Sequence, residues 1–248
     1  KQKTAYEITY GDWSSDVCSS DLPGTFSQYP NILYKSENLD SIYQDSQYRV
    51  VIHNNESGKD IVASTEIADK VLVAQPLPGS SINFYQNPYP VSWYPSADCK
   101  LYGLVFRFHY SEYEVANPSN SSSKYLDWNL GTFVQQASGT NQLFYVPIYS
   151  TQFYVWLQSQ LDPKPGYERT AGAIDIILSS GNKDLYNFYN VNNNTITLSQ
   201  TAPTYSNVYG GLGIVCSRNR KILAGMELNG QSRDSLNNGS ITGDLGFK

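Results

Sequence analysis

The chain has 248 residues, with 17 basic and 22 acidic side chains and a net charge of −5. This length fits one large domain or two ordinary ones, and a chain of this size buries a core without needing disulfides or metals. The mild acidity argues against a nucleic-acid-binding protein, which normally carries a basic stripe. Charged residues make up only 16% of the chain, whereas Tyr alone supplies 21 residues. That composition is typical of an extracytoplasmic β protein, and no segment of the sequence has the ~18 uncharged apolar residues of a membrane-spanning helix.

The front of the chain carries an unusual string, GDWSSDVCSSDL, at residues 11–22. The whole string resembles the translation of sequencing-adapter DNA joined to a gene, and the alternative is an ordinary loop rich in Ser and Asp. On the first interpretation residues 1–22 are an artefact or a remnant of a missing N-terminal part, and the genuine protein resumes near Pro23. We then expect residues 1–22 to pack poorly, and burial of Trp13 and Val17 in a core would contradict that interpretation.

The number and spacing of the cysteines and histidines limit which metal sites and disulfides are possible. With Cys18 assigned to the adapter-like string, Cys99 and Cys216 remain, and neither lies in a paired spacing such as CxxC. The chain has only two His residues, so a zinc site built on His or Cys is not supported. Cys99 and Cys216 either pair in an oxidising compartment or stay as buried thiols. We expect no metal and no cofactor.

Alternation of apolar and polar residues predicts a β-hairpin in the first part of the chain. Residues 48–54 form one strand, a turn rich in Asn and Gly follows, and residues 60–67 return as the second strand. Two prolines and a glycine then break the pattern, so residues 71–81 are interpreted as a linker. This organisation predicts a truncated β-sandwich domain over residues 23–79 and a second β-rich domain over residues 80–248.

The second domain begins with a short strand at residues 91–94, which carries Trp93, followed by a polar turn and a long strand at residues 101–113. Four residues of the long strand share one face by alternation: Leu104, Phe106, Phe108 and Tyr110. A Trp strand, a turn and a Tyr-led strand is the order of fibronectin type III-like sandwiches, although many antiparallel β domains match it. Residues 117–124 (NPSNSSSK) predict a polar loop that faces solvent.

Helices interrupt the β pattern of the second domain. Residues 151–161 have helical spacing with Thr at the start and Pro after the end, and residues 183–189 predict a second short helix. Residues 173–180 predict a buried strand, residues 212–217 a further strand, and residues 237–243 an irregular segment. The second helix is expected to face the core with three residues: Leu185, Phe188 and Tyr189. The predicted fold class is therefore mainly β, with two immunoglobulin- or fibronectin III-like sandwich units and one or two short helices inserted in the second.

Three residues near the end of the long strand carry reactive side chains. His109 has the opposite parity to Glu112 and Glu114, so it faces away from both. The two glutamates share a face and have the composition of a glycosidase carboxylate pair. The alternative is a solvated strand end. No nucleophile elbow, HExxH zinc motif or phosphate-binding loop occurs in the sequence.

Aromatic residues are a second kind of candidate site, because flat Tyr and Trp rings stack on sugars or peptides at low rotamer cost. Six candidates cluster near prolines or flank a Gly-rich turn: Tyr85, Tyr89, Trp93, Tyr94, Tyr205 and Tyr209. The alternative is ordinary core filling. The turn itself contains Gly210, Gly211 and Gly213 and precedes a predicted strand, not a helix, so it indicates close backbone packing and not phosphate binding.

Six segments, in chain order, carry a family resemblance: LPGTFSQYPNILYKSENL, YRVVIHNNESGKDIVASTEI, VSWYPSADCKLYGLVFRFHY, KYLDWNL, DLYNFYNVNN and PTYSNVYGGLGIVCSR. The resemblance covers roughly residues 22–247 and is to a family of Bacteroidota outer-membrane or cell-surface lipoproteins of unknown function. Genes of that family often lie near TonB-dependent transporters. The resemblance implies an exported protein of β-sandwich domains, attached to the membrane through a lipid on an N-terminal Cys that this chain does not contain. It assigns no catalytic residue.

These observations favour a non-enzymatic cell-envelope lipoprotein. Its expected role is to bind a ligand or a partner, such as a TonB-dependent transporter, as an accessory of an outer-membrane uptake or surface assembly. A surface glycan-binding or adhesion module with Tyr and Trp contacts is the alternative. A glycoside hydrolase that uses Glu112 or Glu114 is the enzymatic hypothesis.

Overall fold

The protein is described by a computed structural model over residues 42–44, 46–55, 57–85, 88–135, 143–193 and 204–248. The expectations for residues 1–22, including Trp13 and Val17, lie outside this range. The fold is mainly β, as predicted, with three antiparallel sheets. No helix among the described residues combines the length and the apolar character needed to cross a bilayer. The chain divides into two compact units, Lys1–Ile67 with Asn187–Ser217 and Ala68–Tyr186 with Arg218–Lys248.

The first unit contains the predicted hairpin. Strand β1 (Gln47–Asn54) pairs antiparallel with β2 (Lys59–Glu66), and the short strand β9 (Val208–Tyr209) pairs with the other edge of β2. Gly210 follows β9 with φ +80, and a Cβ at this position would lie 3.0 Å from the carbonyl oxygen of Asp60. This confirms the expectation of close backbone packing at the Gly-rich turn, because only Gly adopts this backbone without strain.

The strand predicted at residues 212–217 is wrong, because no residue of this segment belongs to a strand. The side chain of Asn207 takes the place of a neighbouring strand. Its Oδ1 accepts the N–H of Val215 at 2.9 Å, and its Nδ2 donates to the carbonyl oxygen of Val215 at 2.7 Å. An Asn side chain that satisfies the backbone locally competes with sheet pairing.

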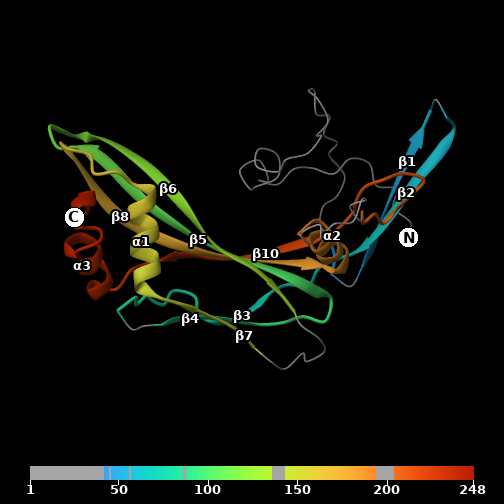
Figure 1. The fold of residues 1–248 in the computed structure, drawn as a ribbon, viewed down its shortest axis with the longest axis horizontal. Coiled ribbons are helices and arrows are strands. Elements are labelled where there is room, and N and C mark those ends of the chain that lie inside the picture. The colour runs from blue at the N-terminus through green and yellow to red at the C-terminus, as the bar shows by residue number, and fades with distance from the viewer. Residues whose placement is uncertain (1–41, 45, 56, 86–87, 136–142, 194–203) are drawn as a thin grey trace, which may run out of the picture. The chain divides into compact units, whose positions relative to one another are not determined.

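The second unit is built on a four-stranded antiparallel sheet in the order β10-β8-β5-β6 (Figure 1). Its strands are β5 (Cys99–Glu114), β6 (Asn117–Val134), β8 (Tyr167–Asn182) and β10 (Arg218–Met226). Burial alternates along β5 as predicted, and the apolar residues on its inner face all lie in the core: Leu104, Phe106, Phe108 and Tyr110. The inner face of this sheet therefore organises the core of the unit.

The polar segment 117–124 is exposed as expected, but it is not a loop. It forms the first part of β6 and pairs with the end of β5, with Ser123 opposite Ser111 and Ser122 opposite Glu112. The tight connection after β5 brings this segment back beside its partner, so cross-strand hydrogen bonds override the weak strand propensity of its residues.

A second, three-stranded sheet has the order β3-β4-β7, with β3 (Leu72–Gln75), β4 (Tyr89–Tyr94) and β7 (Phe144–Ile148). Residues 72–75 were expected in a linker, and that interpretation is wrong for them, since they pair with β4. Prolines that follow a strand end it without preventing it. Trp93 of β4 packs on Tyr102 of β5 with ring centroids 5.7 Å apart, so the two sheets share one core.

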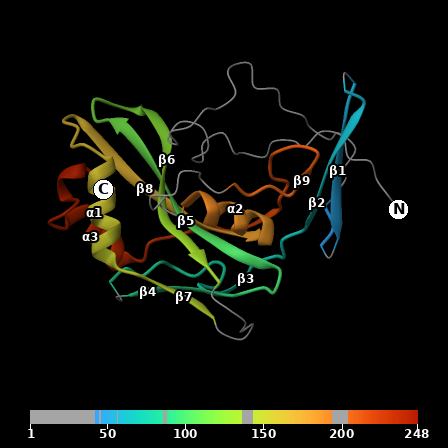
Figure 2. The same cartoon turned by 45° about the vertical axis from the view of Figure 1, so that its right-hand side comes forward.

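Helix α1 (Ser150–Gln160) occupies the segment expected to be helical and inserts Phe153 and Leu157 into this core. In Figures 1 and 2 it lies beside β6 and follows directly after β7. Phe153 packs against Phe84 and Phe108, with ring centroids 4.7 and 5.7 Å apart. These contacts fix the rotation of α1 about its own axis, and with it the direction of the remaining α1 side chains.

Two further helices differ from the sequence expectation. Helix α2 (Lys183–Asn193) is longer than predicted, and Phe188 is exposed instead of facing the core, because α2 buries none of its described side chains fully. Helix α3 (Gly230–Asn238) was not predicted and is followed by the short 3-10 helix η1 (Gly243–Leu245). Its N-cap Asn229 accepts the N–H of Ser232 at 2.9 Å, so capping compensates for a sequence with little apolar periodicity.

Cys99 is a free thiol buried in the core of the second unit, as one of the two alternatives expected. Burial raises the pKa of the Cys99 thiol, and its Sγ lies 3.7 Å from the carbonyl oxygen of Asp69. A thiol with a raised pKa inside a core is chemically inert, which gives Cys99 a packing role.

Candidate ligand-binding groove and the buried charge cluster

A groove of about 510 Å³ lies in the second unit between β6, β7 and α1. β6 and β7 are each the last strand in the order of their sheet, so the groove runs where neither strand has a further neighbour. Its lining comes from these three elements: Trp128, Asn129, Leu130, Phe133, Val146, Pro147, Ile148, Gln152, Val155, Trp156 and Ser159. Its volume is within the range of small-molecule binding sites.

Two tryptophans form the central wall of the groove. Their rings stack, with centroids 5.5 Å apart and planes at 18°. Trp128 lies on the inner face of β6 opposite Phe106 and is nearly buried, whereas Trp156 is half-buried on α1. Phe153 lies within 6.0 Å of both rings and holds the pair from the core side. The core thus fixes one face of the pair in place, and Trp156 remains partly open to the groove.

The polar members of the lining are uncharged. Asn129, Gln152 and Ser159 carry amide and hydroxyl groups, and none of the described residues in the lining is acidic, basic or His. The Oδ1 of Asn129 accepts the N–H of Gly131 at 3.0 Å, which orients its amide. Rigid aromatic surface beside a few neutral donors and acceptors is the composition of a site for an uncharged, hydroxyl-bearing ring.

The aromatic residues singled out in the sequence lie elsewhere. Trp93 and Tyr89 are buried in the core, and Trp93 stacks on Phe144 with centroids 5.1 Å apart. Tyr85 and Tyr94 are exposed in the second unit, outside the groove lining. Tyr205 is half-buried and Tyr209 is exposed, and both belong to the first unit. Of the six predicted aromatic residues, only the exposed tyrosines Tyr85, Tyr94 and Tyr209 have rings that are open for stacking on a ligand.

Sequence reasoning missed the tryptophan pair of the groove. Trp156 lay within the helix predicted at residues 151–161, and Trp128 lay within a segment quoted only for family resemblance. The available signal was the polarity around them, because Asp127 and Asn129 flank Trp128, and Val155 and Ser159 lie on the exposed side of α1. Pairing the two rings requires the tertiary arrangement of β6 and α1, which no local pattern supplies.

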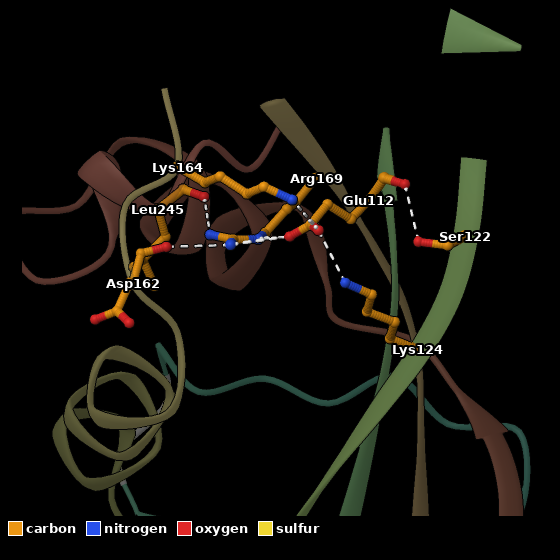
Figure 3. A network of polar contacts seen from close by, with 7 residues as sticks. All are labelled: Glu112, Ser122, Lys124, Asp162, Lys164, Arg169 and Leu245. Carbon is orange, nitrogen blue, oxygen red and sulfur yellow. Dashed lines mark hydrogen bonds and ion pairs between the residues drawn. The ribbon is translucent and has the colours of Figure 1, made fainter. Parts of the chain in front are cut away.

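At the end of β5 beyond the groove, the charged residues form a compact cluster around Glu112 (Figure 3). The side chain of Glu112 is only 6% exposed. Its Oε1 accepts from the Nζ of Lys124 at 2.8 Å and from the Nζ of Lys164 at 3.1 Å, while its Oε2 accepts from Arg169 at 3.0 Å. One carboxylate therefore binds three cations.

Arg169 connects this cluster to the end of the chain. Its Nη1 donates to the carbonyl oxygen of Leu245 at 2.6 Å, and its Nη2 donates to that of Asp162 at 3.1 Å. The backbone N–H of Arg169 donates to Gly246 at 2.8 Å, and its carbonyl oxygen accepts from Lys248 at 2.9 Å. The buried guanidinium thus ties the C-terminal segment and the connection after α1 to the sheet.

The electrostatics of Glu112 differ from those of a glycosidase acid. Burial opposes its ionisation, but hydrogen bonds from Lys124, Lys164 and Arg169 outweigh burial and lower the pKa of Glu112 to about 2. A general acid needs a raised pKa so that it holds a proton at neutral pH. The solvated-end interpretation is wrong for Glu112, which continues the buried face of β5, whereas Glu114 is exposed.

His109 faces away from Glu112, as the alternation predicts. It lies on the opposite face of the sheet, where its Nε2 is 2.8 Å from the Oδ2 of Asp175. On the same face, Arg107 makes a bidentate pair with Asp127 at 2.8 Å for both bonds. These contacts cross between neighbouring strands of the sheet, so they act as cross-strand pairs.

Within the described part of the chain, no three His, Cys, Asp or Glu side chains are arranged to hold a metal ion. Comparison with known proteins adds no assignment: the chain matches no protein-family model, and no curated protein sequence matches it.

Proposed function

We propose that this chain is a non-enzymatic binding protein of the cell envelope that takes up a carbohydrate in the groove between β6, β7 and α1. The observation that carries the proposal is the stacked pair of Trp128 and Trp156, whose partly open ring lies beside neutral amide and hydroxyl groups. Sugar rings present an apolar face of C–H groups and a rim of hydroxyls, and this lining offers a partner for each. The groove therefore replaces the exposed tyrosines as the centre of the glycan-binding hypothesis.

The contacts of Glu112 support a role without catalysis. Its three cations use both carboxylate oxygens, and a pKa of about 2 keeps it ionised and paired. A glycosidase nucleophile or acid has to contact substrate, whereas Glu112 is enclosed by protein groups. Its surroundings are those of a structural ion cluster.

The envelope location, the lipid anchor and a TonB-dependent transporter as partner rest on the family resemblance. Two sheets sharing one core in the second unit support a sandwich-like domain of the fibronectin III kind as part of this proposal. Affinity purification of the full protein from gently solubilised membranes tests the partner. We expect a transporter to copurify in a defined complex, and recovery as a free monomer would contradict this part of the proposal.

Calorimetric titration with a panel of neutral oligosaccharides tests the binding role. We expect Trp156→Ala to lower the affinity for the best-bound oligosaccharide about tenfold, because one stacked aromatic ring contributes roughly 1 kcal/mol beyond its buried area. Tyr94→Ala is the matched control, since it removes an exposed aromatic ring outside the groove. Binding that is unchanged in Trp156→Ala, or equally weakened in Tyr94→Ala, would remove the groove as the site.

A further inference from the structure

Lys124 and Lys164 have hydrogen-bonding capacity that the described part of the protein does not use. Each ammonium group has three donors, and among the described residues each donates to one acceptor, the same Oε1 of Glu112. Lys164 also lies over the ring of Tyr167, 3.3 Å from its centroid. The two side chains are 43% and 44% exposed, in contrast to Glu112 and Arg169 at 6% and 5%. The buried half of the cluster is saturated, and the exposed half is not.

The cluster also carries uncompensated positive charge. Three cations surround one carboxylate, and among the described residues Glu112 is the only acid that pairs with either lysine. Two ammonium groups on one oxygen atom are close neighbours and repel each other. An anion placed between their exposed sides would relieve that repulsion and accept their remaining hydrogens through charge-assisted bonds.

Lys124 lies on β6, one of the elements that form the groove, and Lys164 lies on the connection between α1 and β8. On β6, Lys124 precedes Trp128 by four residues, so it is on the same face and about 13 Å away along the strand. On the other side, α1 carries Trp156 and ends at Gln160, and Lys164 follows shortly after. Helix α1 contacts β6 through the stacked rings of Trp156 and Trp128. The two lysines meet at Glu112 and are not part of the groove lining, which ends with Trp128 on β6 and Ser159 on α1.

From this placement we infer that the carbohydrate bound in the groove carries an acidic group, a carboxylate or a sulfate ester, which Lys124 and Lys164 bind. The inference rests on the proposed function and names the class of its ligand. The tryptophan pair holds a sugar ring through its apolar face, and the lysine pair holds the charge of a neighbouring sugar ring. A neutral lining with a cationic end selects acidic glycans over neutral ones.

The experiment uses matched oligosaccharides of the same linkage and length in neutral, uronic acid and sulfated forms, titrated into the wild-type protein. We expect an acidic form to bind at least about tenfold more tightly than its neutral counterpart at about 0.02 M salt. That preference should shrink to less than about threefold at about 0.5 M salt, where screening is strong. The form preferred separates carboxylate from sulfate as the acidic group.

Lys124→Gln and Lys164→Gln should each abolish most of the preference, so that the acidic and neutral members of a pair bind alike. Lys221→Gln, which removes an exposed charge from β10, is the matched control and should keep the preference. If a lysine variant is too unstable to assay, the salt dependence of the wild type decides alone. Neutral and acidic forms binding equally would overturn the inference and leave the groove as a neutral-glycan site. No binding of any form would overturn both the inference and the proposed function.

Discussion

Two neighbouring regions of one sheet face use their side chains in opposite ways. Around Glu112, a carboxylate and a guanidinium are buried and every strong interaction they make is with the protein itself. Around Trp128 and Trp156, aromatic surface is held rigid from the core side and left partly open on the other. A buried charge with a full set of partners stabilises the fold, whereas preorganised aromatic surface without cover is suited to binding. The more reactive-looking residue in the sequence is therefore the structural one.

The largest effect is expected from Glu112→Ala. This substitution leaves Arg169 buried and without its carboxylate, and we expect the free energy of unfolding to fall by about 3 kcal/mol or more. Urea denaturation measures this change. Glu114→Ala is the matched control two residues along β5, where an exposed side chain should matter by less than about 0.5 kcal/mol. Equal effects of the two substitutions would mean that the cluster does not stabilise the fold.

Acid should weaken the same region. The pKa of Glu112 is about 2 in the folded protein and has an ordinary value of 4.5, so its contribution is complete above pH 4.5. It is lost as the pH falls from there through about 2. We expect the wild type to lose on the order of 2 kcal/mol more than Glu112→Gln over this range, allowing for screening at the two half-exposed lysines. Denaturant unfolding at several pH values checks it, and parallel pH profiles would contradict it.

A smaller effect on stability is expected in the groove. Trp156 is half-buried, so Trp156→Ala should lower the free energy of unfolding by about 1–2 kcal/mol, less than the removal of a fully buried aromatic side chain. The same variant should lose most of its glycan affinity. Thermal denaturation together with calorimetry compares the two losses. A variant that unfolds as readily as Glu112→Ala would assign Trp156 to the core and not to a binding surface.

The smallest effect is expected on the opposite face of β5. Arg107 makes an ion pair with Asp127 there, and the two side chains are 21% and 28% exposed. Water screens a partly exposed pair, so Arg107→Ala should cost about 1 kcal/mol, well below the cost of Glu112→Ala. Chemical denaturation in low and high salt measures it. If Arg107→Ala lowered the free energy of unfolding as much as Glu112→Ala, the buried and the exposed face of β5 would not differ in their contribution to stability.

Much of the fold could be predicted from the sequence, because alternation and turn residues are local signals. The hairpin of β1 and β2 and the buried face of β5 followed directly from period-two patterns. The predictions failed where backbone groups form hydrogen bonds with partners that no local sequence pattern indicates. Side-chain hydrogen bonds of Asn207 replaced a predicted strand, and pairing with β5 turned a Ser-rich loop into the start of β6.

The candidate site was less predictable, for a physical reason. Parity showed that Glu112 faces away from His109, but the three cations around it come from separate parts of the chain: Lys124, Lys164 and Arg169. Trp128 and Trp156 likewise meet only when α1 lies against β6. Sequence patterns indicate which way a side chain faces along one element, and the partner across the core depends on how the elements pack.

The most direct test of the binding role follows the indole N–H signals of the tryptophans by NMR during titration with matched neutral and acidic oligosaccharides. The chain has four tryptophans, and substituting them one at a time assigns each indole N–H signal to its residue. Trp93 is fully buried outside the groove, so its signal is the internal reference. We expect the signals of Trp128 and Trp156 to shift with saturation while that of Trp93 stays in place. Saturable binding that leaves both groove signals unmoved, or no binding at all, would contradict the assignment of the groove as the ligand site.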